Sequence, residues 1–301
     1  MSVKRIGRLL KETFAEWNKD KASRLAAALS YYTVFSLAPL LIIAIAIAGS
    51  VFGEEAAKGE IITQIQGLVG REGAEVIQTA IENASKSEEE GSIASLISIG
   101  VLIFGASGVF AELQDALNTV WEVESKPELG IVAFIRKRIL SFTMILGIGF
   151  LLLVSLVISA VLAGINHYTN QLLPGFDPLW QIVNFIVSFA VITLLFAMIY
   201  KFLPDVKITW GDVSIGAAMT ALLFVFGKFL IGLYLGNSSF SSTYGAAGSI
   251  VIILVWAYYS AQILFFGAEF TQVYARRYGS QILPDRFSVP LNRQSKQKKE
   301  R

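Results

Sequence analysis

The chain has 301 residues, of which 54% are hydrophobic and only 16% are charged, and its mean hydropathy is +0.60. These values exceed those of ordinary soluble domains and indicate an integral membrane protein. The absence of Cys excludes a disulfide framework, a thiolate nucleophile and a thiolate metal site. The net charge is only +2, so the distribution of charge is more informative than its sum.

The chain begins with an amphipathic stretch, KRIGRLLKETFAEW at residues 4–17. Its apolar residues recur at helical spacing, opposite basic ones, and they are Ile6, Leu9, Leu10, Phe14 and Trp17. This pattern predicts that residues 1–25 form a helix on the cytoplasmic surface of the membrane, in contact with anionic phospholipid. A soluble helix close to the membrane is the alternative.

Six apolar segments are long enough to cross a hydrocarbon core, which takes about 20 residues. They are residues 26–49, 92–111, 139–164, 180–200, 212–235 and 248–270. We therefore predict an all-α, polytopic transmembrane domain over residues 26–278. The first segment lacks a short apolar region ending in a cleavage site, so we expect it to stay in the mature chain.

Residues 50–91 separate the first two spans and contain two amphipathic patterns. One has Ile61, Ile62, Ile65, Leu68 and Val69, the other has Val76, Ile77, Ala80, Ile81 and Ala84, and the break falls near Gly70. They predict an external helical hairpin. The segment is acidic, and it could cap the helix bundle or shape an entrance.

Basic residues define the orientation. Of the Lys and Arg outside the spans, 21 fall on one side of the predicted membrane and 3 on the other. Both termini are therefore expected in the cytoplasm. Residues 279–301 end in SKQKKER and are predicted to be a basic, disordered cytoplasmic tail.

Lys228 is a charged residue at membrane depth. It lies seven residues before the outer end of its span, roughly 10 Å deep at about 1.5 Å per residue. Its side chain either snorkels to the outer headgroups or faces an open cleft that attracts an anion. Polar residues predicted to share this cleft are Asn184, Ser188, Ser95, Ser98, Tyr258, Tyr259 and, nearer the cytoplasmic half, Gln262.

Glu269 lies at the opposite, cytoplasmic end of the last span. We expect it to form a structural salt bridge at the interface, because basic residues of matching depth are available there. The possible partners are Lys201, Arg136, Arg138 and Arg24.

The segment GKFLIGLYLGNSSFSSTYGAAGSIVIILVWAYYSAQILFFGAEFTQVYA, at residues 227–275, resembles the C-terminal part of the YihY/virulence factor BrkB family of bacterial membrane proteins. AAALSYYTVFSLAPLL at 26–41 and LQDALNTVWEV at 113–123 are similar to that family's other recurrent patterns. The resemblance covers about residues 20–278. It implies a six-helix integral protein of the bacterial plasma (inner) membrane with a transport-like role, although members have also carried a ribonuclease label.

The residues argue against ribonuclease activity. RNA hydrolysis needs a metal site or a general acid/base pair in a pocket, and the only histidine, His167, falls in a predicted external loop. The carboxylates after the second span are interpreted as the solvated face of a helix, whose apolar residues turn toward the membrane. The carboxylates are Glu112, Asp115, Glu122, Glu124 and Glu128, and the apolar residues are Leu113, Leu117, Val120 and Trp121.

We therefore predict no enzyme activity, no cofactor or metal, and no nucleic-acid partner. A phosphate-binding G-x-x-x-x-G-K-[ST] motif does not occur in the sequence, which disfavours direct drive by ATP. The function predicted is transport of an anionic, lipid-like amphiphile or an anionic solute. A non-transporting scaffold of the bacterial envelope is the alternative, and a ribonuclease is a distant third.

Overall fold

The computed structural model describes residues 3–85, 92–126, 177–236, 248–280 and 282–291, together with residue 136 and scattered helical residues between 139 and 151. The helices are α1 (Val3–Lys19), α2 (Ala22–Phe52), α3 (Glu54–Ser85), α4 (Ser92–Val120), α6 (Asp177–Phe202), α7 (Trp210–Gly236) and α9 (Gly248–Tyr278). The strands are β1 (Val123–Ser125), β2 (Val206–Lys207), β3 (Leu283–Pro284) and β4 (Ser288–Pro290).

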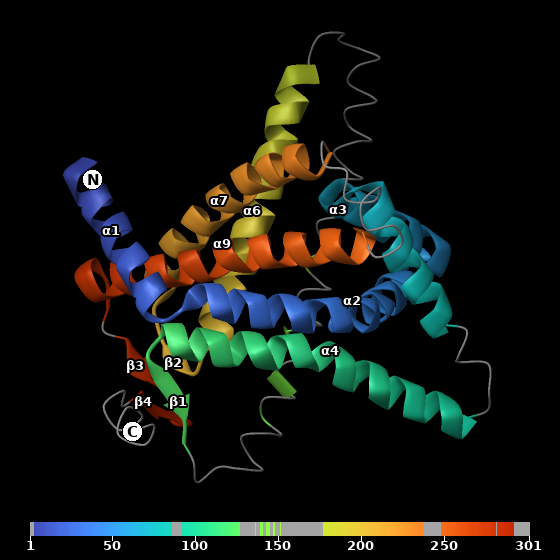
Figure 1. The fold of residues 1–301 in the computed structure, drawn as a ribbon, viewed down its shortest axis with the longest axis horizontal. Helices are drawn as coiled ribbons and strands as arrows, with labels where there is room; N and C mark the ends of the chain where they lie inside the picture. The colour runs from blue at the N-terminus through green and yellow to red at the C-terminus, as the bar shows by residue number, and fades with distance from the viewer. Residues whose placement is uncertain are drawn as a thin grey trace.

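Four of these helices are long and apolar enough to cross a membrane. The qualifying segments are Ala22–Ser50, Trp180–Phe202, Trp210–Ile231 and Ile250–Tyr278, which match four of the six predicted spans. The predicted span 92–111 falls within α4, whereas most of 139–164 lies outside the described residues. Figure 1 shows α2 between α4 and α9, with α7 crossing near α9.

The two ends of the bundle differ. Figure 1 shows α1 and the four strands gathered at one end, which we call the strand end, while α3 lies at the other. Both sheets at the strand end are antiparallel pairs, β1 with β4 and β2 with β3. The strand end is therefore built from segments that are far apart in the sequence.

The strands correct the prediction that residues 279–301 form a disordered tail. Ser288 Oγ donates a 2.6 Å hydrogen bond to the backbone oxygen of Asp205, and the backbone N–H of Leu291 donates to the oxygen of Glu122 at 2.7 Å. These bonds pair backbone groups that composition alone could not assign to a partner. Residues 292–301 lie outside the described part.

α3 is helical throughout, where the sequence predicted two helices with a break near Gly70. Nevertheless, Lys58 Nζ lies 3.4 Å from Glu82 Oε1, and these residues are 24 positions apart. A straight helix would separate them by about 36 Å at 1.5 Å per residue. α3 must therefore fold back on itself, and its apolar residues cluster with Ile45 of α2.

α7 and α9 approach each other through small residues. A Cβ atom added at Gly216 of α7 would lie 1.7 Å from Thr271 Oγ1 of α9. One added at Gly227 would lie 2.7 Å from the Tyr259 hydroxyl. Only glycine permits such close backbone approach, and this type of contact is common between helices in membranes.

Candidate functional site

The region around Lys228 combines charge with apolar surface. Lys228 is exposed on α7, and its neighbours Phe226 and Phe229 are 61% and 63% exposed. On α6, Asn184 and Ser188 are also exposed. The cleft predicted from these residues remains a prediction.

The other predicted cleft residues lie in different surroundings. Tyr259 packs against Gly227, the residue before Lys228, and Tyr258 is 38% exposed. The side chains of Ser95 and Ser98 lie outside the described part of the structure.

Glu269 differs from the expected interfacial ion pair. It is 0% exposed, and neither carboxyl oxygen has a hydrogen-bond partner among the described residues. Two of its predicted partners are engaged elsewhere, since Lys201 Nζ donates to the oxygen of Ile208 and Arg136 pairs with Asp205. The physical reason is that α9 continues to Tyr278 and α1 packs over its last turns, so position 269 is enclosed.

Glu269 belongs to a row of polar residues on α9, which we call the polar row: Gln262, Glu269, Gln272 and Arg276. Their spacings of seven, three and four residues place them on one face of a helix. The side-chain oxygens of Gln262 and Gln272 are also buried without a hydrogen-bond partner in the described structure. Since buried polar groups are normally paired, three unpaired members in one row are unusual.

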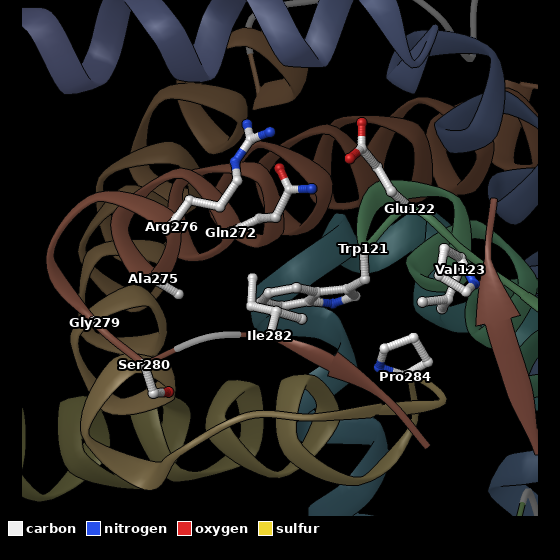
Figure 2. Close-up of a pocket in the computed structure, with 11 residues that line it drawn as sticks. Trp121, Glu122, Val123, Gln272, Ala275, Arg276, Gly279, Ser280, Ile282 and Pro284 are labelled. Carbon is white, nitrogen blue, oxygen red and sulfur yellow. The ribbon is translucent and has the colours of Figure 1, made fainter. Parts of the chain in front are cut away.

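The polar row ends in a pocket of about 400 Å³ at the strand end. Figure 2 shows the side chains of Arg276, Gln272 and Glu122 grouped on one side of the pocket. Trp121 and Ile282 provide an apolar surface below them. The pocket is therefore amphipathic, and Gln272, which is 3% exposed, connects it to the polar row.

α1 lies against this end of α9. Leu9 is 1% exposed and clusters with Phe270 and Val273. Glu16 Oε1 lies 3.0 Å from Arg276 Nη2, and Glu12 pairs with Arg277. α1 is thus held to α9 by one apolar cluster and two ion pairs.

Lys19 links α1 to the pocket. Its Nζ lies 2.6 Å from Glu16 Oε2 and 3.2 Å from Glu122 Oε1. Burial alone would raise the pKa of Glu16, but hydrogen bonds from Lys19 and Arg276 hold this pKa below its usual value. Burial would lower the pKa of Lys19, but hydrogen bonds to Glu16 and Glu122 hold it above the ordinary value.

Asp205 forms a separate, well-paired cluster at the strand end. Asp205 is 1% exposed, and its carboxylate accepts hydrogen bonds from Gln114, Asn118 and Arg136. The guanidinium of Arg136 also lies 3.5 Å from Asp285. This cluster ties the end of α4 to the strands, which is a structural role.

The helix after the predicted second span also differs from its prediction. Leu113, Leu117, Val120 and Trp121 were expected to face the membrane, but all four are buried in the main core. Glu122, expected on a solvated face, lines the pocket and has a positive φ of 56°. Packing of α4 against its neighbours, which the sequence did not show, accounts for both differences.

Long apolar helices packed into a bundle, with an amphipathic pocket at one end, define a polytopic helical membrane protein. Residues 13–288 match the family described as Virulence factor BrkB, and the chain belongs to that family. This confirms the resemblance found in the sequence. No solved structure is significantly similar to the chain.

Curated relatives are named mostly as membrane proteins. A UPF0761 membrane protein of Psychrobacter sp. is 27% identical over 271 residues, covering 88% of this chain and 48% of that protein. A UPF0761 membrane protein of Psychromonas ingrahamii is 31% identical over 267 residues, covering 85% of this chain and 84% of that protein. YfkH of Bacillus subtilis, which is named as a putative ribonuclease-like protein, is 22% identical over 282 residues, covering 92% of this chain and 97% of that protein. The chain spans about half the length of the Psychrobacter relative.

Proposed function

We propose that this chain moves an anionic, lipid-like amphiphile across the bacterial inner membrane, with both termini in the cytoplasm and α3 as an external hairpin. Glu269 is the observation that carries the proposal. A charged carboxyl group buried in a spanning helix without a described partner is costly, and at the centre of a span the cost is about 3 kcal/mol. A scaffold would be more stable with an apolar residue there, whereas polar groups inside spans commonly mark transport pathways.

Lys228 supports the choice of an anionic amphiphile. Lys228 is exposed on α7, and so are Phe226 and Phe229. Side chains one or two positions apart point to different faces of a helix, so this turn of α7 offers a positive charge for an anionic headgroup and, on other faces, apolar contacts for an acyl chain. Asn184 and Ser188 on α6 supply hydrogen-bonding groups to the proposed cleft. Tyr259, beside Gly227, supplies a further hydroxyl.

Transport can be tested with the full chain in proteoliposomes containing fluorescent NBD-phosphatidylglycerol. Dithionite quenches only the outer-leaflet probe, so transport is measured as quenching beyond the outer-leaflet fraction of protein-free vesicles. We expect the wild-type chain to accelerate movement of this anionic lipid more than that of NBD-phosphatidylcholine. Failure to accelerate phosphatidylglycerol movement would overturn the proposal and favour the envelope scaffold.

Variants of Lys228 then test the cleft. Lys228→Met should slow phosphatidylglycerol movement several-fold because it removes the positive charge, and Lys228→Arg should retain most of it. Lys207→Met is the matched control, since Lys207 is exposed at the strand end, in β2. A Lys228→Met protein as fast as wild type would show that Lys228 only snorkels.

We further propose that the chain is not an enzyme, despite the ribonuclease-like name of YfkH. The ionisable groups that line the pocket, Glu122 and Arg276, are engaged in ion pairs with Lys19 and Glu16. The purified chain should therefore leave a fluorogenic RNA intact. RNA cleavage that is abolished by Glu122→Gln would contradict this expectation.

A further inference from the structure

We propose that Glu269 is a proton-binding site, which exchanges its proton with water at the strand end when α1 separates from α9. The enclosure of this residue is the first argument. Its carboxyl group is 0% exposed and both oxygens lack partners among the described residues. Burial without a partner disfavours the carboxylate, so the neutral acid is the resting form.

The charges that face Glu269 also favour the neutral form while α1 is docked. They are Asp20 and Glu16, which oppose a negative charge, and Arg276 and Lys19, which favour it. Glu16, however, is paired with both of these basic residues, and Lys19 is also paired with Glu122. Their positive charge is therefore already offset, and little of it is available to stabilise a carboxylate at position 269.

A polar route to water is present. Gln272 lies one helical turn beyond Glu269, a rise of about 4.5 Å, and its buried side chain lines the pocket at the strand end. Its side-chain oxygen has no hydrogen-bond partner in the described structure and can accept a bond from an entering water. Figure 2 shows Arg276 next along the same helix, at the pocket.

Separation of α1 from α9 requires the loss of one apolar cluster, around Leu9, and of two ion pairs. The ion pairs with Arg276 and Arg277 involve partly exposed side chains, and such pairs contribute little to stability. The chain turns between α1 and α2 at Lys21, whose φ is 55°. When α1 moves away, Glu16 and Lys19 leave with it. Arg276 then loses its partner and favours ionisation of Glu269.

The role of Glu269 as the coupling site of a transporter rests on the proposed function. Proton binding by Glu269, however, can be measured without transport. The probe is dicyclohexylcarbodiimide, which reacts with protonated carboxyl groups in apolar surroundings, applied to the full chain in lipid nanodiscs. Mass spectrometry should find the adduct on Glu269, and its rate of formation should fall about tenfold per pH unit once the carboxyl ionises. Glu269→Gln should lack this adduct. No adduct, or a rate independent of pH while the protein stays folded, would overturn the proton site.

Access through the strand end is tested with a water-soluble carbodiimide. Leu9→Ala weakens the packing of α1 on α9 without changing any charge that faces Glu269, so it should speed labelling of Glu269 several-fold. Leu194→Ala is the matched control, because it is the same change in side chain at a residue of α6 that is 44% exposed. Equal rates in all three proteins would overturn control by α1.

The two proposals can fail separately. Lipid movement without labelling of Glu269 would reject the proton site and leave the transport function standing. Labelling of Glu269 without lipid movement would reject the transport function and leave the proton site standing.

Discussion

Gly267 of α9 lies so close to Thr220 of α7 that an added Cβ atom would be 1.9 Å from Thr220 Oγ1. The contact is reciprocal, because Gly216 of α7 has the same relationship to Thr271 of α9. Each threonine donates a hydrogen bond to the glycine oxygen four residues earlier in its own helix, at 2.8 Å and 2.7 Å. Both helices thus carry a Gly-x-x-x-Thr pattern at their contact, which allows the backbones to approach closely.

Gly267→Ala should destabilise the protein by about 1–3 kcal/mol, since the new methyl group would force the two helices apart. Rotation of Thr220 would not relieve the clash, because its Cβ atom is 2.8 Å from the same position. Thermal unfolding of the purified protein in detergent measures the change. Gly100→Ala, which meets no atom within 4 Å, is the control and should be neutral or slightly stabilising. Equal melting temperatures for Gly267→Ala and the wild-type chain would contradict the close contact.

The docking of α1 should weaken at low pH. The pKa of Glu16 is held below its usual value of 4.5. The contribution of Glu16 to the docking of α1 is therefore fully present above about pH 4.5 and is lost as the pH falls through the lowered pKa. The chain has no Cys, so spin labels can be attached uniquely at Asn18→Cys and Tyr278→Cys. Their separation should increase on acidification. With Glu16→Gln, the pH dependence of the separation should be smaller, because the ion pair of Glu16 with Arg276 no longer contributes to it, and an unchanged pH dependence would refute the role of Glu16.

The exposed part of the apolar face of α1 should contact the membrane. Leu9 and Leu10 pack in the cluster with α9, whereas Ile6 and Phe14 are 44% and 55% exposed. Replacing both exposed residues by Asp should make spin labels on α1 more accessible to water in anionic vesicles, without lowering the melting temperature. Leu9→Asp, in contrast, should lower the melting temperature. Unchanged water accessibility in the double variant would favour a soluble, membrane-proximal helix.

The proposed orientation makes a separate prediction. Cysteines introduced at Ser87 and Ser239 should react with an impermeant thiol reagent added to intact cells, whereas one at Ser295 should not. The physical reason is the excess of basic residues on the side assigned to the cytoplasm. Labelling of Ser295→Cys in sealed cells would reverse the assignment.

Local patterns predicted the elements better than their ends. Hydropathy located the spans of α2, α6, α7 and α9 because each is a continuous apolar run. The last predicted span ends at Phe270, where the apolar run stops, whereas α9 continues to Tyr278. The extension is stabilised by α1, since Leu9 packs against Val273. Hydropathy alone does not show such a contact.

The candidate site depends on contacts between distant segments, which one sequence does not show. The burial of Glu269 follows from the packing of α1 on α9, and the ion pair of Glu16 with Arg276 joins residues 260 positions apart. The spacing of Glu269, Gln272 and Arg276 on one helical face was visible in the sequence and could have indicated the polar row. Lys228 was identified from local pattern alone, and its cleft remains a prediction.

The cluster around Asp205 has a consequence for biogenesis. Its partners include Asn118 of α4 and Ser288 of β4, so the cluster joins segments synthesised early to one synthesised much later. Because chains generally begin to fold from the N-terminal side during synthesis, the spans can insert well before Ser288 leaves the ribosome. Until then, the backbone oxygen of Asp205 lacks its hydrogen bond from Ser288, and the oxygen of Glu122, after the end of α4, lacks its bond from Leu291. The strand end is therefore among the last parts of the molecule to reach its final structure. It stays accessible to quality-control proteases for longest.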